Sequence, residues 1–219
     1  MVAPSRSGRL NVNIRGKAQR GIAILVLRIL HDAWPATTAD SRVTRTADED
    51  AISDVLQEKM VEAKNRVNPV PLIRFEREPQ SDGPRFNAPL GLIDIKILYT
   101  WNDDTSLTME CKRITSTENS LALEYIRNGI NRFASGKYSP CHAFGIVTAY
   151  VICGNPEGCA ERVSTTLGRE PEDETGYDSE FGWQTDDDLL EGKRHYRTRH
   201  RQKIVANTIE LIHVFVSID

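Results

Sequence analysis

The sequence predicts a single α/β domain in which a mixed β-sheet is flanked by helices. Apolar and polar residues alternate over 93–99 and 107–112, which indicates two paired strands. Residues 143–153 form a continuous apolar run rich in Val, Ile and aromatics, typical of a buried central strand. The chain of 219 residues is long enough to bury a substantial core. We therefore expect one domain over 17–219, preceded by a loose tail at 1–16.

The first part of this domain is expected to be helical. Apolar residues recur at helical spacing over 18–34, and Pro35 should end that helix. Thr46, with Glu49 three residues later, has the spacing of a capping box. It predicts a second helix from residue 46 to about residue 66.

The remaining elements alternate between strand and helix. Residues 72–78 form a probable strand before the hairpin at 92–114. Thr115 and Glu118 repeat the capping-box pattern ahead of a helix at 121–135. A further helix over 156–167 and a last strand over 208–218 give the order α-α-β-β-β-α-β-α-β.

The hairpin at 92–114 brings several charged residues together. Its two apolar faces must lie on the same side of the sheet, which pairs odd-numbered residues with odd-numbered ones. A three-residue loop at 102–104 satisfies this requirement. Asp94 then lies opposite Lys112, and Glu110 lies opposite Lys96. The pattern predicts a polar, solvent-facing surface with two carboxylates and two lysines.

These residue types suit the hydrolysis of an anionic phosphodiester. Asp94 and Glu110 supply hard oxygen ligands for Mg²⁺ or Mn²⁺, and the backbone carbonyl of Cys111 could complete the set. Such a metal polarises the phosphorus centre and activates a bound water. Lys112 would orient that water or stabilise the developing negative charge. The alternative interpretation is a solvated strand face that carries a surface ion pair.

The arrangement Asp94…Glu110-Cys111-Lys112 resembles the core motif of the PD-(D/E)xK nuclease superfamily, which has the restriction-endonuclease-like fold. Leu92-Ile93 stand where the superfamily usually has a proline before the Asp. Downstream stretches resemble a bacterial, defence-associated subset of that superfamily: 125–133, 136–138, 145–151, 196–201 and 209–215. The resemblance implies a magnesium-dependent endonuclease that acts on DNA, with a role in bacterial or phage defence.

Further site residues follow from this resemblance. In the superfamily a glutamate from the helix before the core sheet often supports the metal site, which favours Glu49, with Glu58 in reserve. For each of them alone, the stronger interpretation is an ordinary acid: a helix-start acid favoured by the macrodipole for Glu49, and a solvated helix face for Glu58. Five cations are candidates for nucleic-acid phosphates. They are Arg127, Arg132, Lys137, Arg199 and Arg201.

The charge is unevenly distributed along the chain. The net charge of −3 argues against a broad nucleic-acid-binding surface. Residues 170–191 are acidic without any Lys or Arg, whereas 193–203 are strongly basic. We expect 170–192 to be an acidic loop or insertion that is solvated or, less simply, shields the basic run. His195 and His200 should contact phosphate or solvent, and His213 should be a satisfied core histidine.

Composition sets broad limits on the cellular context. Neither a membrane-spanning run nor a secretory leader is recognisable, so we expect a cytoplasmic protein without membrane association. The four cysteines lack zinc-site spacing and are expected to be free, buried thiols. The alternatives to a DNase are an RNase, a nuclease activated by a partner, and a non-catalytic relative that binds nucleic acid or protein. Targeting could also involve a homodimer.

Overall fold

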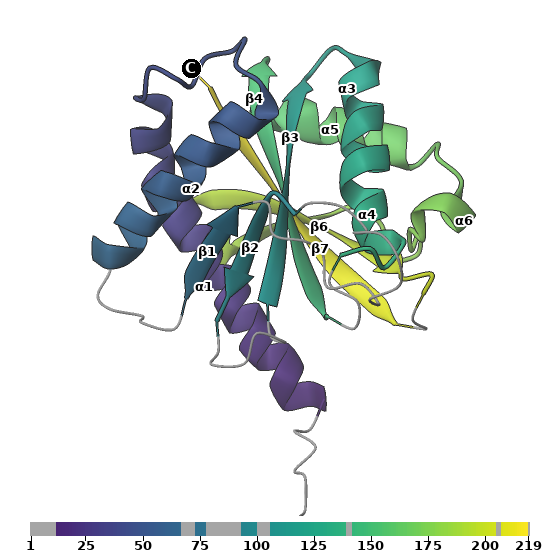
Figure 1. The fold of residues 1–219 in the computed structure, drawn as a ribbon. Helices are drawn as coiled ribbons and strands as arrows, with labels where there is room; N and C mark the ends of the chain where they lie inside the picture. Colours follow the sequence, from purple (N-terminus) through teal and green to yellow (C-terminus); the bar gives the residue numbers. More distant parts are fainter. Residues whose placement is uncertain are drawn as a thin grey trace, which may run out of the picture.

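The computed structural model describes residues 12–66, 73–77, 93–99, 106–138, 142–204 and 207–218. Within these ranges seven strands form one mixed sheet in the order β1-β2-β3-β4-β7-β6-β5 (Figure 1). Helices cover both faces of the sheet. The predicted mixed α/β fold is thus confirmed.

The three central strands are parallel, and each outer strand pairs antiparallel with its inner neighbour. The strands are β1 (Arg74–Arg77), β2 (Ile95–Leu98), β3 (Ser106–Thr115), β4 (Phe144–Cys153), β5 (Gln184–Leu190), β6 (Lys193–Arg201) and β7 (Thr208–Ser217). As predicted, β4 is central, between β3 and β7, and is buried along most of its length.

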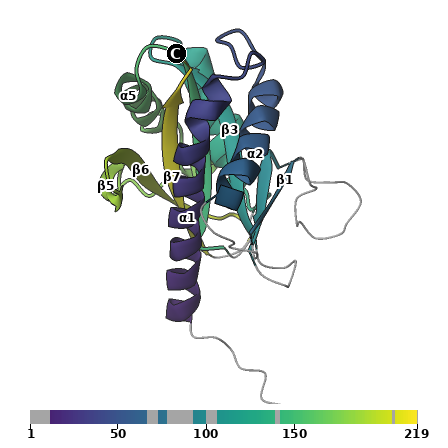
Figure 2. The ribbon, with the colours of Figure 1, turned by 90° about the vertical axis from the view of Figure 1, so that its left-hand side faces the viewer.

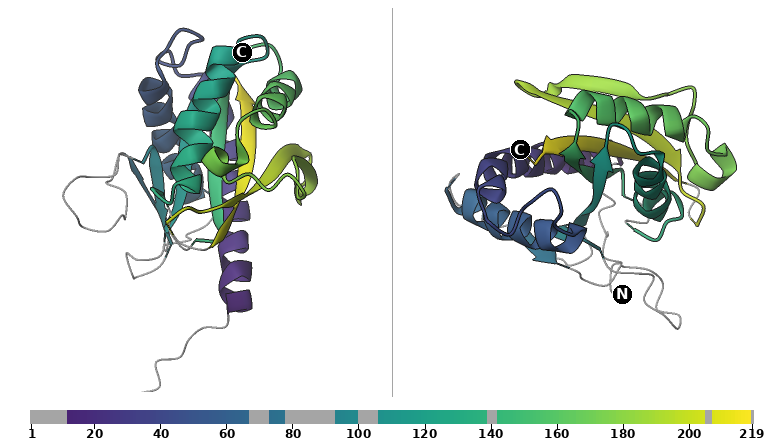
Figure 3. Two further views of the ribbon diagram at one scale, coloured as in Figure 1. Left: turned by 90° about the vertical axis from the view of Figure 1, so that its right-hand side faces the viewer. Right: turned by 90° about the horizontal axis from the view of Figure 1, so that it is seen from above.

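Two layers of helices enclose this sheet (Figures 2 and 3). The helices are α1 (Val12–Thr38), α2 (Glu49–Arg66), α3 (Asn119–Glu124), the π-helical turn η1 (Tyr125–Ile130), α4 (Asn131–Ala134), α5 (Pro156–Leu167) and α6 (Glu172–Thr175). One core lies under α1 and α2, and a second lies under α3, η1, α4 and α5. None of the helices in the described ranges has the length and apolar character needed to cross a membrane.

The predicted ends of the first two helices were wrong in three places. α1 begins at Val12, within the expected tail, and continues through Pro35 to Thr38. Pro35 has no backbone N–H and therefore removes one hydrogen bond from the helix. The helix continues because its last turn packs into the core: Thr37 is buried, and its hydroxyl donates to the carbonyl of Ala33 at 3.1 Å. The cap of α2 is Asp48 rather than Thr46, since its Oδ1 accepts from the N–H of Ala51 at 2.7 Å.

The helix after β3 also differs from the prediction. It begins at Asn119, and its middle widens into the π-helical turn η1. Thr115 Oγ accepts from the N–H of Glu118 at 3.0 Å. Glu118 itself precedes the helix and provides no side-chain cap, so the reciprocal capping box is not formed.

The acidic segment is not a loop. Residues 172–175 form α6, and 184–190 form β5, the edge strand that pairs with the basic strand β6. Ion pairs connect the two strands: Asp186 with Arg197 at 2.8 Å and Asp187 with Arg194 at 3.1 Å. The expected element order lacked both strands, because polar and charged residues occupy most of their positions and hide the apolar alternation that marks a strand.

Two of the four cysteines agree with the prediction. Cys111 and Cys159 are free and buried, whereas Cys153 is free but exposed. Cys141 lies outside the described residues.

Candidate active site

The charged residues of the predicted site come from three parts of the fold. The pairs Ile95↔Met109 and Ile97↔Leu107 align β2 with β3. Odd-numbered residues therefore face each other, as predicted, but the register is shifted by two residues from the predicted one. Continuing it places Asp94 beside Glu110, not beside Lys112. The loop expected at 102–104 lies outside the described residues.

A second correction concerns burial. The predicted site was expected to face solvent, yet Glu110 is 0%, Lys112 4% and Asp94 9% exposed. The helix containing η1 covers this side of β3. At Gly129 a Cβ atom would lie 3.5 Å from Cγ of Lys112 and 4.0 Å from Cγ of Glu110. A glycine in η1 thus lets the helix backbone come close to the two charged side chains.

Lys112 is the centre of the resulting cluster. Its Nζ lies 2.8 Å from Oε1 of Glu110, 2.5 Å from Oε1 of Glu49 and 3.8 Å from Oδ2 of Asp94. It also donates to the backbone carbonyl of Cys111 at 2.7 Å. The N–H of Cys111 in turn donates to Oδ2 of Asp94 at 2.7 Å. Side chains far apart in the sequence are thereby held around one segment of β3.

Glu49 reaches this cluster from the first turn of α2. Its second oxygen, Oε2, accepts from the backbone N–H of Arg113 at 3.2 Å. The Glu49 end of the cluster borders a surface hollow of about 370 Å³. Glu58, the reserve candidate, lies elsewhere and pairs with Arg42 on the surface at 2.7 Å. The structure thus places Glu49, the preferred candidate, in the cluster and Glu58, the reserve, away from it.

Arg132 joins the cluster from α4. Its Nη1 lies 2.8 Å from Oε1 of Glu110 and donates to the hydroxyl of Tyr138 at 2.5 Å. The guanidinium also lies over the Tyr138 ring, 5.5 Å from its centroid. One oxygen of Glu110 therefore receives both Arg132 and Lys112. Tyr138 had no assigned role in the sequence, although it stands in the Gly136-Lys137-Tyr138 stretch of the resemblance.

Burial and neighbouring charges shift the pKa values in the cluster. Burial raises the pKa of Glu110 to about 8, and the nearby Asp94 carboxylate adds to the shift against the opposing effect of Lys112 and Arg132. Burial acts to lower the pKa of Lys112, but the carboxylates of Glu110, Asp94 and Glu49 outweigh it and raise that pKa. Lys112 accordingly stays charged, and any further cation near Glu110 would stabilise the ionised form of its carboxyl group.

The donor set is chemically suited to a hard divalent cation. Among the described residues, the buried Oε2 of Glu110 has no hydrogen-bond partner, which is costly for a carboxylate oxygen. Asp94 and the carbonyl of Cys111 provide further oxygens of the type that Mg²⁺ and Mn²⁺ prefer. In the described part of the chain, no three or more His, Cys, Asp and Glu side chains group as metal ligands. The predicted set has two carboxylates and a main-chain carbonyl.

The other predicted phosphate-binding cations divide by position. Lys137 follows α4 close to Arg132, and burial, with Arg132 adding to it, lowers its pKa. Arg127 is exposed and pairs with Glu170 at 3.2 Å. Arg199 pairs with Asp178 at 3.8 Å, and Arg201 is exposed at a surface hollow lined by several acids. The last three cations are not part of the Glu110–Lys112 cluster.

The histidine predictions were wrong for two of three residues. His195 and His200 are both 0% exposed, so they do not contact solvent. Nε2 of His195 lies 3.1 Å from Nε2 of His31 on α1. His213 is a core histidine, as predicted, with Tyr125 Oη 2.9 Å from Nδ1 and Thr198 Oγ 2.7 Å from Nε2. The burial of His195 and His200 could have been predicted only if the sequence had indicated that 193–201 form a strand, β6, within the sheet.

Comparisons of the chain with protein-family models, with curated proteins and with solved structures gave no match.

Proposed function

We propose that this chain is a divalent-metal-dependent nuclease that hydrolyses phosphodiester bonds, with DNA as its substrate. The observation that carries the proposal is the unpartnered, buried Oε2 of Glu110, next to Asp94 and a charged Lys112. Burying a carboxylate without a partner for both oxygens destabilises a fold, so a functional ligand is the natural explanation.

The roles in this proposal follow from the contacts. Asp94, Glu110 and the Cys111 carbonyl would hold Mg²⁺ or Mn²⁺, which when bound polarises a phosphate oxygen and lowers the pKa of a coordinated water. Lys112, which contacts Glu110 and Glu49, would orient the attacking water or stabilise the developing charge. Glu49 keeps the Lys112 ammonium in place. The resemblance of Asp94…Glu110-Cys111-Lys112 to the PD-(D/E)xK superfamily agrees with these roles and is the basis for proposing DNA and a role in defence.

A cleavage assay tests the proposal directly. The full chain would be incubated with supercoiled plasmid, single-stranded DNA and RNA, in Mg²⁺, Mn²⁺ or EDTA. Glu110→Gln and Lys112→Met keep the size of the buried side chains, whereas Glu58→Gln and Lys59→Met are their surface controls. Thermal unfolding of each variant shows that it folds.

We expect metal-dependent cleavage that falls by about 10²-fold or more in the two cluster variants and is unchanged in the controls. Mn²⁺ binding, followed by electron paramagnetic resonance, should weaken in Glu110→Gln. Full turnover by either cluster variant would show that the site is misassigned. Absence of cleavage by the wild type under all conditions would favour a partner-activated or purely binding protein.

A further inference from the structure

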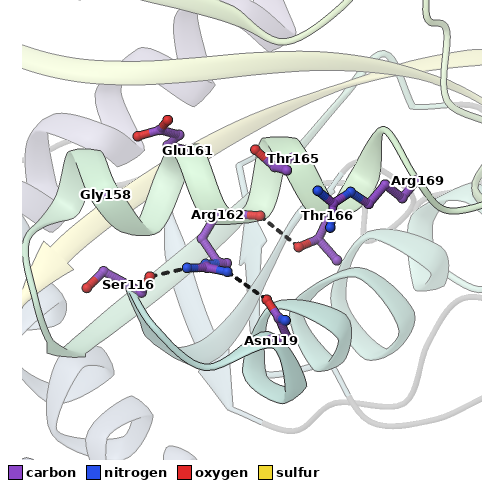
Figure 4. Close-up of a pocket in the computed structure, with 8 residues that line it drawn as sticks. All are labelled: Ser116, Asn119, Gly158, Glu161, Arg162, Thr165, Thr166 and Arg169. Carbon is purple, nitrogen blue, oxygen red and sulfur yellow. Dashed lines mark hydrogen bonds between the residues drawn. The ribbon is translucent and has the colours of Figure 1, made fainter.

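A second hollow lies away from the Glu110–Lys112 cluster, between α5 and the chain that leads from β3 into α3 (Figure 4). Its volume is about 340 Å³, within the roughly 300–1,000 Å³ range of ligand sites. It is lined by Ser116, Asn119, Gly158, Glu161, Arg162, Thr165, Thr166 and Arg169. The lining contains no large apolar side chain, which favours a polar ligand.

One stripe of α5 forms much of this lining. Gly158, Arg162 and Thr165 are spaced three or four residues apart, and Arg169 follows just after the helix, so all lie on one side. The opposite side of α5 is buried in the core through Cys159, Ala160, Val163 and Leu167. Core packing of α5 therefore fixes the direction in which Arg162 projects.

Arg162 is held in a defined orientation. Its Nε donates to the carbonyl of Ser116 at 3.1 Å, and its Nη1 donates to Oδ1 of Asn119 at 2.8 Å (Figure 4). A guanidinium has five N–H donors, so three remain for a ligand. A fixed guanidinium loses less conformational entropy on binding than a mobile one.

The second arginine adds charge without a competing partner. Within the described ranges, the Arg169 guanidinium has neither a hydrogen bond nor an ion pair. Glu161 is the single acid in the lining, and in Figure 4 its carboxylate lies on the other side of α5 from the Arg162 guanidinium. The side of the hollow that holds Arg162, Asn119 and Thr166 is thus cationic and rich in hydrogen-bonding groups.

We propose that this hollow binds a phosphate group, with Arg162 and Arg169 as the cationic contacts. Arginine forks match the geometry of phosphate oxygens. The phosphate could belong to a nucleic-acid backbone, an assignment that rests on the proposed nuclease function, or to a small phosphate compound, which does not depend on it. The site is separate from the Glu110–Lys112 cluster, since the two share no residue.

The test uses the full chain in EDTA, so that cleavage plays no part. Isothermal titration with pyrophosphate and fluorescence anisotropy with a labelled oligonucleotide are compared for wild type, Arg162→Gln and Arg169→Gln. Arg28→Gln is the matched control, because Arg28 is an exposed arginine of α1 that lies outside the hollow and has no assigned role in phosphate binding. Arg169→Gln removes no hydrogen bond or ion pair among the described residues, which guards against a folding defect.

We expect each hollow variant to weaken binding of at least one probe by about tenfold, equivalent to one charge-assisted contact, while the control behaves as wild type. Loss confined to the oligonucleotide identifies the backbone as the source, and loss confined to pyrophosphate identifies a small phosphate compound. Wild-type affinity of both variants for both probes overturns the site. Binding of pyrophosphate by a protein that cleaves nothing under all the conditions of the cleavage assay would retain this site while removing the support for nuclease activity of the chain by itself.

Discussion

Replacing Thr198 by valine should destabilise the protein through one deleted oxygen atom. Thr198 Oγ lies 2.8 Å from Nε2 of His200 and 2.7 Å from Nε2 of His213, and all three residues are fully buried. Nδ1 of His200 contacts the carbonyl of Thr175 at 2.9 Å, and Nδ1 of His213 contacts Tyr125 Oη at 2.9 Å. These contacts form a single chain from α6 to η1.

The direction of every proton in this chain follows from its ends. A carbonyl only accepts, so Nδ1 of His200 carries the proton and its Nε2 must accept from Thr198. Thr198 Oγ then accepts from Nε2 of His213, whose Nδ1 accepts from Tyr125. Both rings are neutral, because burial lowers the pKa of His200 to about 4 and that of His213 well below its ordinary value.

Valine has the same shape as threonine but leaves both Nε2 atoms without a partner. An unsatisfied buried group costs about 1–3 kcal/mol, which gives an upper range of about 2–6 kcal/mol for two. His213 can change tautomer while Tyr125 turns to the carbonyl of Val147, 3.3 Å away, so we expect about 2–4 kcal/mol. For a chain of this size that corresponds to a melting temperature lower by roughly 4–16 °C.

Thr148 supplies a matched control with the opposite expectation. It is also a fully buried threonine in the same sheet, but its hydroxyl has no hydrogen-bond partner. Thr148→Val should leave the free energy of unfolding unchanged or raise it by up to about 2 kcal/mol. Urea unfolding measures both variants, and ¹⁵N spectra of the histidines report the tautomers. A Thr198→Val midpoint equal to that of wild type would refute the chain of hydrogen bonds.

Three further outcomes are expected. Arg132→Lys should reduce the initial rate of cleavage by about 10²-fold, whereas Arg127→Lys should change it by less than about threefold. Similar losses in the two variants would contradict a role for the contact between Arg132 and Glu110. Gly145→Ala should cost about 1–3 kcal/mol in urea unfolding, because its Cβ would lie 2.5 Å from the Phe133 ring; a neutral result would contradict that packing. From pH 6.5 down to about 4, the free energy of unfolding should fall by up to about 1.4 kcal/mol per pH unit for each buried neutral histidine. The reason is that histidines of the unfolded chain take up protons in this range and the buried rings of the folded protein do not. Equal urea midpoints at pH 7 and pH 5 would exclude this contribution.

Local patterns were sufficient for much of the fold. The period-two alternation in the 92–114 hairpin predicted which residues of β2 and β3 share a face, and the apolar run predicted the central position of β4. The same alternation could not set the register, because a shift by two residues keeps every side chain on its own face. The distance between Asp94 and Glu110 is therefore determined by the strand register, and the alternation of apolar and polar residues alone cannot predict it.

The second half of the chain shows a different limit. Charged residues on β5 and β6 neutralise each other across strands, as Asp186 does with Arg197. Taken alone, each charged residue indicates a solvated surface. Only the cross-strand pairing of opposite charges allows these two segments to form strands. The same holds for His200, whose burial depends on partners from Thr175 and Thr198.

The burial of the Glu110–Lys112 cluster changes how a substrate would reach it. The side chains of Glu110 and Lys112 are 0% and 5% exposed, whereas those of Arg132 and Glu49 are 28% and 27% exposed. An incoming phosphate therefore meets Arg132 and Glu49 before the inner residues, and the cation attracts it while the carboxylate repels it. If the proposed function holds, productive binding would require Glu49 to keep its charge directed at Lys112. The Glu49–Lys112 contact at 2.5 Å would then serve the entry of the substrate as well as the position of the lysine.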